Sequence, residues 1–164
     1  MIARTGKECP AHLGATCINI LEVFNCPILM VPLGSPLEKP KTIMNPTSGS
    51  HFSMSASELA VLVADNFNAE LHSLYVGKQN PRMVLRSLEA MAQKLDVVFK
   101  SRIAKGAVDK AILIWAQKHD MMVFSRGYSG FKYHMRKVTK KAALGRLERE
   151  VIGESSIPMI IVGD

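Results

Sequence analysis

Short apolar runs of strand length alternate along most of the chain with apolar residues at helical spacing. The five runs that have the length of strands cover residues 42–45, 70–76, 96–103, 121–125 and 158–162. Strands that alternate with helices predict right-handed crossovers and a parallel sheet. The first, fourth and fifth runs are apolar on both faces, as a sheet covered by helices on each side requires. The pattern therefore predicts an open α/β fold.

Residues that are typical of helix N-termini indicate where the helices between these strands begin. Ser55 and Glu58 have the spacing of a capping box ahead of apolar residues at helical spacing. Asn80 and Pro81 predict an N-cap followed by proline at the first helical position. A third helix is expected after Gly106, and a fourth precedes the last strand.

The first forty residues repeat a pattern found at the end of the chain. A leucine–glycine pair, an apolar helical pair and a proline-led apolar run occur in both places at one offset. These pieces begin at Leu13, Ile20 and Pro27 and again at Leu144, Val151 and Pro158. Chance similarity between two helix–proline–strand pieces is one explanation. An internal repeat is the other, with the N-terminal piece as the last helix and strand of a preceding copy.

The repeat interpretation predicts how the chain is organised. Residues 1–40 would be a helix–strand appendage plus a linker, and residues 41–164 would be the domain. A single leftover strand must pair with something. The exposed edge of the last strand, residues 158–162, is the natural place.

Composition and charge narrow the class of protein. The chain has 164 residues, of which 48% are hydrophobic and 21% charged, which is typical of a soluble globular protein. No apolar run approaches the roughly 18 residues that span a bilayer, and the start of the chain lacks the apolar core of a secretory signal. The three cysteines, Cys9, Cys17 and Cys26, have no Cys-x-x-Cys spacing. We therefore expect reduced thiols in a cytoplasmic protein without membrane insertion.

Much of the formal charge of +7 lies near the C-terminal end. The basic residues of that segment are Lys132, Arg136, Lys137, Lys140, Lys141, Arg146 and Arg149. A solvated helix face or an anion-facing surface accounts for them. Tyr128 and Tyr133 could stack on bases, but two aromatic residues do not make a nucleic-acid surface. Nucleic acid is therefore not the partner that we expect.

The residues after the fourth run are the strongest candidates for ligand binding. The run ends at Ser125, and Gly127 and Gly130 follow it three positions apart. Glycine lets backbone amides approach an anion without a Cβ in the way. In an open α/β sheet, ligands sit in loops at the carboxyl ends of strands. A lone Gly-x-x-Gly is usually an ordinary turn, so its place after the fourth strand is what matters.

Other candidate chemistry is sparse. The five histidines show no pairing with cysteines or carboxylates at metal-ligand spacing. His51 has no visible partner that would orient it as a base, and His72 is interpreted as a packed or surface histidine. No Walker lysine motif is present. We therefore expect no metal, no catalytic residue and no enzyme activity.

Taken in order, these pieces resemble the universal stress protein family. The matching segments are residues 46–50, 69–76, the helix after Gly106, the loop 125–130 and the strand 158–162. The resemblance covers about residues 41–164, and the N-terminal piece resembles the tail of a tandem partner. Each motif is short, so the specificity lies in their order and spacing.

The resemblance implies a five-stranded parallel sheet of order 3-2-1-4-5 with helices on both faces. It also implies a homodimer or tandem pair joined through the last strand, and a regulatory role in stress response. Some members bind ATP between the ends of the first and fourth strands. Their pattern is an aspartate after the first strand, then Gly-x-x-Gly, nine residues, and glycine followed by serine or threonine. Other members lack this pattern and do not hold ATP stably.

Several residues of this chain match that nucleotide site. By resemblance, Pro46 and Val76 would border an adenine. Gly127 and Gly130 would offer amides to phosphates, and Gly145 would be the later glycine.

Two departures distinguish this chain from the members that bind ATP. Ser48 stands where ATP binders carry aspartate, and a lost charge-assisted hydrogen bond costs about 1.5–3 kcal/mol, roughly ten- to a hundredfold in affinity. Fourteen residues rather than nine separate Gly130 from Gly145, and five extra helical residues span about 7 Å. Arg146 replaces the hydroxyl residue; it could grip a phosphate, fill the site or lie in water. The sequence leaves open a regulatory domain with an altered ATP site and a nucleotide-free dimerisation or protein-interaction module.

Overall fold

A seven-stranded sheet runs through the computed structural model of the chain, in the order β1-β2-β7-β6-β3-β4-β5. The structure describes residues 2–3, 13–24, 26–35, 38–78, 80–126 and 144–163. The strands are β1 (Ile2–Ala3), β2 (Ile28–Val31), β3 (Thr42–Thr47), β4 (Glu70–Tyr75), β5 (Phe99–Ile103), β6 (Met121–Ser125) and β7 (Met159–Val162). The helices are α1 (Ala15–Val23), α2 (His51–Phe67), α3 (Pro81–Lys94), α4 (Val108–Ala116) and α5 (Arg146–Glu154).

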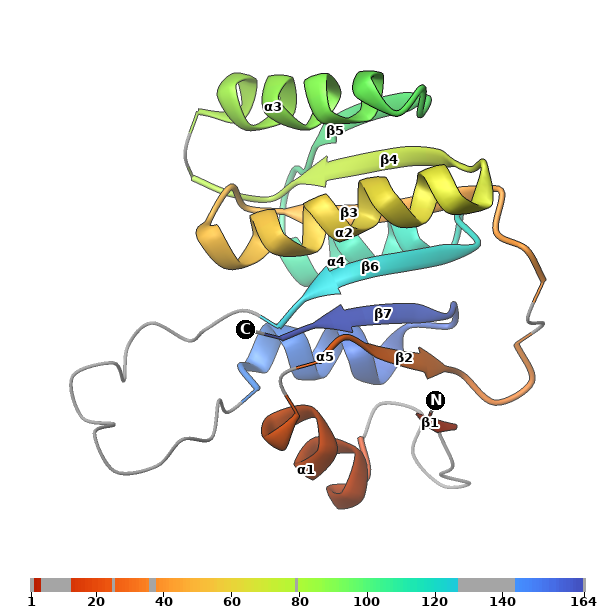
Figure 1. Cartoon of the computed structure of the whole chain (residues 1–164). Coiled ribbons are helices and arrows are strands. Elements are labelled where there is room, and N and C mark those ends of the chain that lie inside the picture. The colour runs from red at the N-terminus through yellow and green to blue at the C-terminus, as the bar shows by residue number, and fades with distance from the viewer. Residues whose placement is uncertain are drawn as a thin grey trace.

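Strands β3 to β7 form the predicted parallel sheet. β3 lies between β4 and β6, β5 pairs with β4, β7 pairs with β6, and all four pairings are parallel. The arrowheads of β4, β6 and β7 point the same way in Figure 1. Numbered from β3, this order is 3-2-1-4-5, so the predicted α/β class and strand order are confirmed.

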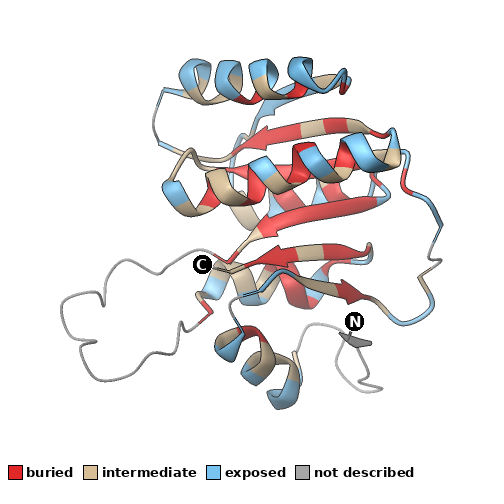
Figure 2. Cartoon of the chain, in the orientation of Figure 1, coloured by how far each residue is buried: buried red, intermediate tan, exposed pale blue. Residues whose placement is uncertain are grey.

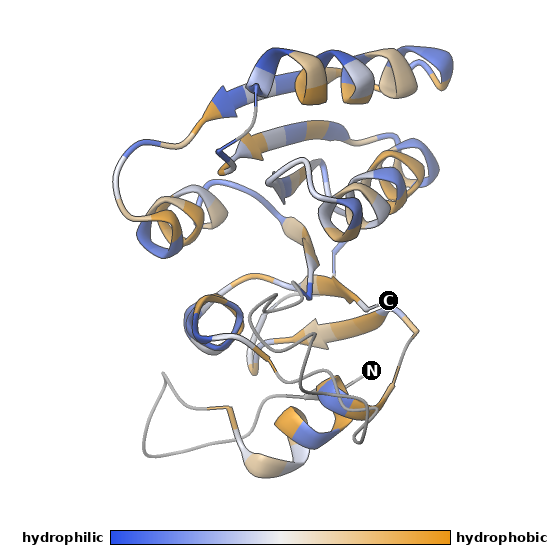
Figure 3. Cartoon of the chain, turned by 90° about the vertical axis from the view of Figure 1, so that its left-hand side faces the viewer, coloured by the Kyte–Doolittle hydropathy of each residue, from blue (hydrophilic) through white to orange (hydrophobic). Residues whose placement is uncertain are grey.

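Helices cover both faces of this sheet, because alternate residues of each strand point to opposite sides. Ile43 and Leu71 pack in one core cluster with residues of α2 and α3. Met44 and Leu74 pack in a second cluster with residues of α4 and α5. The central strands are largely buried in Figure 2, and Figure 3 shows helices on the two sides of the sheet. None of the helices in the described ranges is long and apolar enough to cross a membrane.

The N-terminal strand β2 extends the sheet beyond β7. Their pairing is antiparallel, with Ile28 opposite Ile161 and Met30 opposite Met159. β1 then pairs with β2 in parallel. The prediction that the leftover strand pairs with the edge of the last strand is confirmed. A domain boundary near residue 40 and a homodimer through the last strand stay predictions.

The start of α2 differs from the sequence prediction. The helix begins at His51, and the Ser50 hydroxyl accepts a hydrogen bond from the backbone N–H of Ser53 at 3.3 Å. The capping box at Ser55 and Glu58 was therefore the wrong N-terminus. Ser50, Ser53 and Ser55 are alternative caps, and the helix uses Ser50, the first of them.

Two strand boundaries differ from the prediction by more than one residue. β3 continues through Pro46, which lies opposite Leu74 of β4. The register between β3 and β6 ends at Met44, so the proline interrupts no pairing on that side. β5 begins at Phe99 rather than at residue 96, because Asp96 has a left-handed backbone with a φ of 54°.

Candidate functional site

The carboxyl ends of β3 and β6 form the candidate site. The two strands are parallel neighbours, with Ile43 opposite Met121 and Met44 opposite Met122. β3 leads into α2 on one face of the sheet, whereas α5, the next helix after β6 among the described residues, lies on the other face. In open α/β sheets, ligands bind in the crevice where neighbouring strands send their chains to opposite faces.

Three predicted site residues come together at this end of the sheet. Pro46 is buried near the end of β3, and Ser48 follows that strand. The backbone N–H of Val76 donates to the carbonyl of Thr47 at 2.8 Å, which holds the end of β4 beside the end of β3. The Val76 side chain packs against the core cluster on the α4 and α5 side. The predicted neighbourhood of Pro46, Ser48 and Val76 is therefore present.

Hydroxyl groups fill the start of α2. The hydroxyl cluster consists of Thr47, Ser48, Ser50 and Ser53. The Ser48 Oγ lies 3.0 Å from the Ser50 Oγ and 3.2 Å from the Ser53 Oγ. The Ser53 hydroxyl donates to the Ser50 carbonyl at 2.9 Å. The Ser48 side chain thus serves the turn into α2 and brings no negative charge to the crevice.

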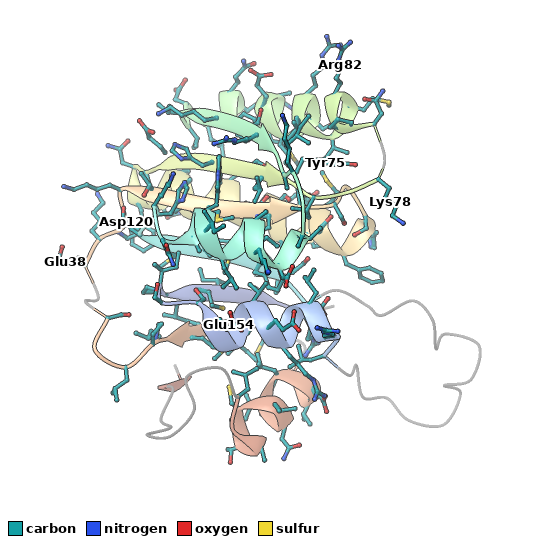
Figure 4. All side chains as sticks on the ribbon, turned by 180° about the vertical axis from the view of Figure 1, so that it is seen from behind. Glu38, Tyr75, Lys78, Arg82, Asp120 and Glu154 are labelled. Atoms are coloured by element: carbon teal, nitrogen blue, oxygen red, sulfur yellow. The ribbon has the colours of Figure 1, made fainter. Side chains whose placement is uncertain are left out.

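The loops after β3 and β4 touch through a glycine. A Cβ built on Gly77 would collide with the Ser48 carbonyl and the Tyr75 ring. Only a residue without a side chain allows this close approach. Figure 4 shows Tyr75 and Lys78 at this end of the sheet, with Glu38 and Asp120 at the opposite end. Gly77 directly follows the predicted strand 70–76, and this position is the signal from which it could have been found.

Gly145 and Arg146 lie at the start of α5, and the arginine side chain pairs with a residue of its own helix. Gly145 is the N-cap of the helix. The Arg146 side chain is 91% exposed, and its Nε donates to Glu150 Oε1 at 2.7 Å. This hydrogen bond raises the pKa of Arg146. The sequence left three alternatives for Arg146, which were to hold a phosphate, to fill the site or to lie in water. The structure shows the third.

A carboxylate that the sequence analysis missed covers the N-terminus of α5. The Glu148 carboxylate accepts hydrogen bonds from the backbone N–H groups of Glu148 and Gly145, and a Cβ on Gly145 would collide with it. Burial raises the pKa of Glu148, and these two hydrogen bonds lower it by less. Negative charge is stabilised at a helix N-terminus. The spacing Gly145-x-x-Glu148 is that of an N-cap and a capping-box glutamate, which was the available signal.

The cation that follows β6 faces away from the crevice. Arg126 is only 5% exposed, and its Nη1 donates to the carbonyl of Phe24, at the end of α1, at 3.2 Å. Its backbone N–H donates to the carbonyl of Val162 at 2.8 Å. A Cβ on Gly163 would collide with its guanidinium group. Arg126 therefore ties β6 to β7 and α1.

Two of the predicted site residues, Gly127 and Gly130, lie outside the described residues. The other five are Pro46, Ser48, Val76, Gly145 and Arg146. Within the described ranges, no group of three or more His, Cys, Asp and Glu side chains could hold a metal ion.

A polar network occupies the earlier part of β4, away from the crevice. His119 Nδ1 lies 2.7 Å from the carbonyl of Trp115, so it donates there and His119 Nε2 accepts. His72 Nδ1 lies 2.8 Å from that Nε2 and donates to it, while His72 Nε2 lies 2.9 Å from Glu70. Burial lowers the pKa of His119. Hydrogen bonds from Lys100 and then His72 lower the pKa of Glu70. His72 is thus a packed histidine.

Several solved structures with a similar fold are universal stress proteins, although no family model and no curated protein matches the chain. A universal stress protein from Archaeoglobus fulgidus DSM 4304 is similar with a TM-score of 0.69 at 20% identity, over 88% of this chain and 52% of that one. A universal stress protein in complex with cAMP has a TM-score of 0.60 at 20% identity, over 76% of this chain and 98% of that one.

A longer protein matches almost the whole chain, including the N-terminal elements. It is a functionally unknown protein from Pseudomonas aeruginosa PAO1, with a TM-score of 0.62 at 15% identity, over 99% of this chain and 61% of that one. The chain therefore spans 52% and 61% of the two longer neighbours. With the parallel sheet order around β3 and these structural neighbours, the chain has the fold of the universal stress proteins.

Proposed function

We propose that this chain is a regulatory domain of the universal stress protein type whose crevice between β3 and β6 binds an adenine nucleotide, such as ATP, weakly. The observation that carries this proposal is the parallel pairing of β3 and β6 as neighbours, with α2 and α5, the next described helices after them, on opposite faces of the sheet. In this proposal Pro46, near the end of β3, and Val76, which follows β4, would border the adenine. The neighbour solved in complex with cAMP supports the same class of ligand.

Two features of the crevice account for the weak binding. Ser48 engages the hydroxyl cluster rather than presenting a carboxylate to a ribose. Glu148 covers the amides of α5 that a phosphate would use. Each loss of a charge-assisted hydrogen bond weakens binding by about 1.5–3 kcal/mol, or roughly ten- to a hundredfold. In this proposal the site senses its ligand and does not convert it.

Equilibrium binding of a fluorescent ATP analogue tests the proposal. The wild-type chain should bind saturably in the millimolar range or below. Ser48→Asp restores the missing carboxylate and should tighten binding by about ten- to a hundredfold. Ser101→Asp on the exposed strand β5 is the matched control, because it adds the same charge far from the crevice. If neither the wild type nor Ser48→Asp binds the ATP analogue saturably, the proposal is wrong.

A nucleotide-free protein-interaction module is the second candidate, and the Glu148 carboxylate on α5 favours it. The Glu148 carboxylate already stabilises the N-terminus of α5, so a phosphate bound there would add less stabilisation. This function predicts that neither the wild type nor Glu148→Gln binds the ATP analogue. Saturable binding of the fluorescent ATP analogue to the Glu148→Gln variant would reject this second candidate.

A further inference from the structure

An apolar groove lies between α2 and α3 on the surface of the molecule. It has a volume of about 300 Å³ and is lined by Val61, Leu62, Met91 and Leu95, together with Glu58 and Lys94. Leu62 and Leu95 are 50% and 38% exposed. Figure 1 shows the two helices side by side in front of the sheet. Large apolar side chains are thus left partly uncovered on a helical surface, which is a feature of interaction sites.

The two helices that border the groove carry opposite net charge. α2 has two acidic residues, Glu58 and Asp65, and neither Lys nor Arg. α3 has three basic residues and one acidic residue, which are Arg82, Arg86, Lys94 and Glu89. All of these charged residues are exposed. One side of the groove is therefore acidic and the other side is basic.

The charges beside the groove are not paired within the chain. In the ranges that the structure describes, neither Glu58 nor Lys94 forms an ion pair, although both line the groove. By contrast, Glu150 of α5 pairs with Arg146 of its own helix. Both Glu58 and Lys94 are therefore available to a partner that covers this surface.

The charge pattern is complementary to itself in one of two possible arrangements. α2 and α3 run in the same direction, since the colours of both pass from left to right along the chain in Figure 1. A second copy can face this surface around a two-fold axis that lies either along the helices or across them. With the axis along the helices, α2 of each copy lies on α3 of the other, and acidic residues meet basic ones at two symmetry-related places. With the axis across the helices, α2 lies on α2 and acidic residues meet acidic ones. Like charges that face each other cost free energy, so the charges select the first arrangement.

The size of this surface sets the strength of the association that it can support. α2 has 17 residues and α3 has 14. At 1.5 Å per residue and about 10 Å of width per helix, the two helices present a face of about 20 by 20 Å, or roughly 400 Å². A standard interface buries about 800 Å² on each partner, and smaller ones are typical of weak, transient complexes. The expected dissociation constant is therefore in the micromolar to millimolar range.

We propose that the surface formed by α2 and α3 docks a second copy of this chain, with α2 of each copy on α3 of the other. Leu62 and Leu95 become covered in the groove, and Glu58 of each copy lies opposite Lys94 of the other. The surface uses neither the edge of β7 nor the crevice between β3 and β6. The proposal therefore does not depend on whether the crevice binds a nucleotide.

Sedimentation equilibrium of the full chain over a range of concentrations tests the proposal. Leu62→Glu places a charge in the groove. Ile114→Glu is the matched control, because Ile114 is 58% exposed and lies on α4, at the other face of the sheet. Glu58→Lys and Lys94→Glu each reverse one charge, and the double variant exchanges the two charges. Circular dichroism checks that each variant is folded.

The wild type and Ile114→Glu should form dimers, whereas Leu62→Glu should remain a monomer at the same concentrations. Each single charge reversal should weaken the association roughly three- to thirtyfold, because it removes two symmetry-related ion pairs, and the double variant should regain most of this loss. A wild type that stays monomeric up to millimolar concentration overturns the proposal. Dimers of Leu62→Glu as tight as those of the wild type also overturn it, because the copies then pair through another surface. A double variant that associates no more tightly than the single variants rules out the arrangement of α2 on α3.

Discussion

The replacement Glu148→Gln tests the reason given for weak nucleotide binding. The Glu148 carboxylate accepts hydrogen bonds from the backbone N–H groups of Gly145 and Glu148 at the start of α5. A phosphate that reaches these amides must first displace it. Glutamine keeps the size of the side chain and removes its charge, so displacement costs less.

The magnitude follows from the hydrogen bonds that would be exchanged. Hydrogen bonds to a charged group contribute about 1.5–3 kcal/mol each. If a nucleotide regains one of them without competition, its affinity should rise roughly ten- to a hundredfold. The helix itself loses a favourable anion at its N-terminus, worth about 0.3–1 kcal/mol, so the variant should remain folded.

The assay is a titration with a fluorescent ATP analogue, with Glu150→Gln as the matched control. Glu150 is on the same helix and its replacement removes the same charge, but it contacts the exposed Arg146 rather than the helix amides. Glu150→Gln should change the affinity by less than about threefold, as expected for an exposed ion pair. Equal affinities of the two variants would refute the argument that Glu148 competes with phosphate.

Three further predictions concern stability. Burial lowers the pKa of His119 below its ordinary value of 6.5, so below that pH the unfolded chain takes up a proton that the folded chain does not. The free energy of unfolding should therefore fall as the pH drops below 6.5, more steeply than in His119→Gln; equal slopes would contradict this. Ser57→Ala should cost about 1–3 kcal/mol in denaturant unfolding, because the Ser57 hydroxyl donates to the buried Asn45 Oδ1 at 2.7 Å; a loss below about 0.5 kcal/mol would show that Asn45 finds another donor. Gly77→Ala should lower the thermal midpoint, with a cost of about 1–3 kcal/mol, because its Cβ meets the Ser48 carbonyl; an unchanged midpoint would mean that the loop yields.

The fold was predictable from the sequence because its signals are local and consistent. β6 was predicted with its observed bounds, and Asn80 with Pro81 marked the start of α3 correctly. The proline and the apolar residues after it placed β7 within one residue. The repeated offset also indicated that a leftover strand would pair with β7. Hydrophobic periodicity and caps were sufficient for these elements.

The site was less predictable, because its details depend on which of several possible partners a side chain contacts in the folded chain. Arg146 could have turned to the crevice, and only the structure shows that it pairs with Glu150 one turn along the helix. The start of α2 was missed because Ser50 and Ser55 both have capping character. Glu148 was overlooked because glycine is a less specific cap than serine or threonine, so its capping-box spacing to Gly145 was not recognised.

The most direct test of the central claim is an amide NMR titration of the full chain with ATP. In the proposed function, the ligand binds at the carboxyl ends of β3 and β6. This proposal predicts that the saturable shifts concentrate at Ser48, Val76 and Gly145, and leave the amides of Lys41 and Asp120 at the opposite end of the sheet unchanged. Shifts centred on Lys41 and Asp120, or no saturable shift in the wild type, would contradict it.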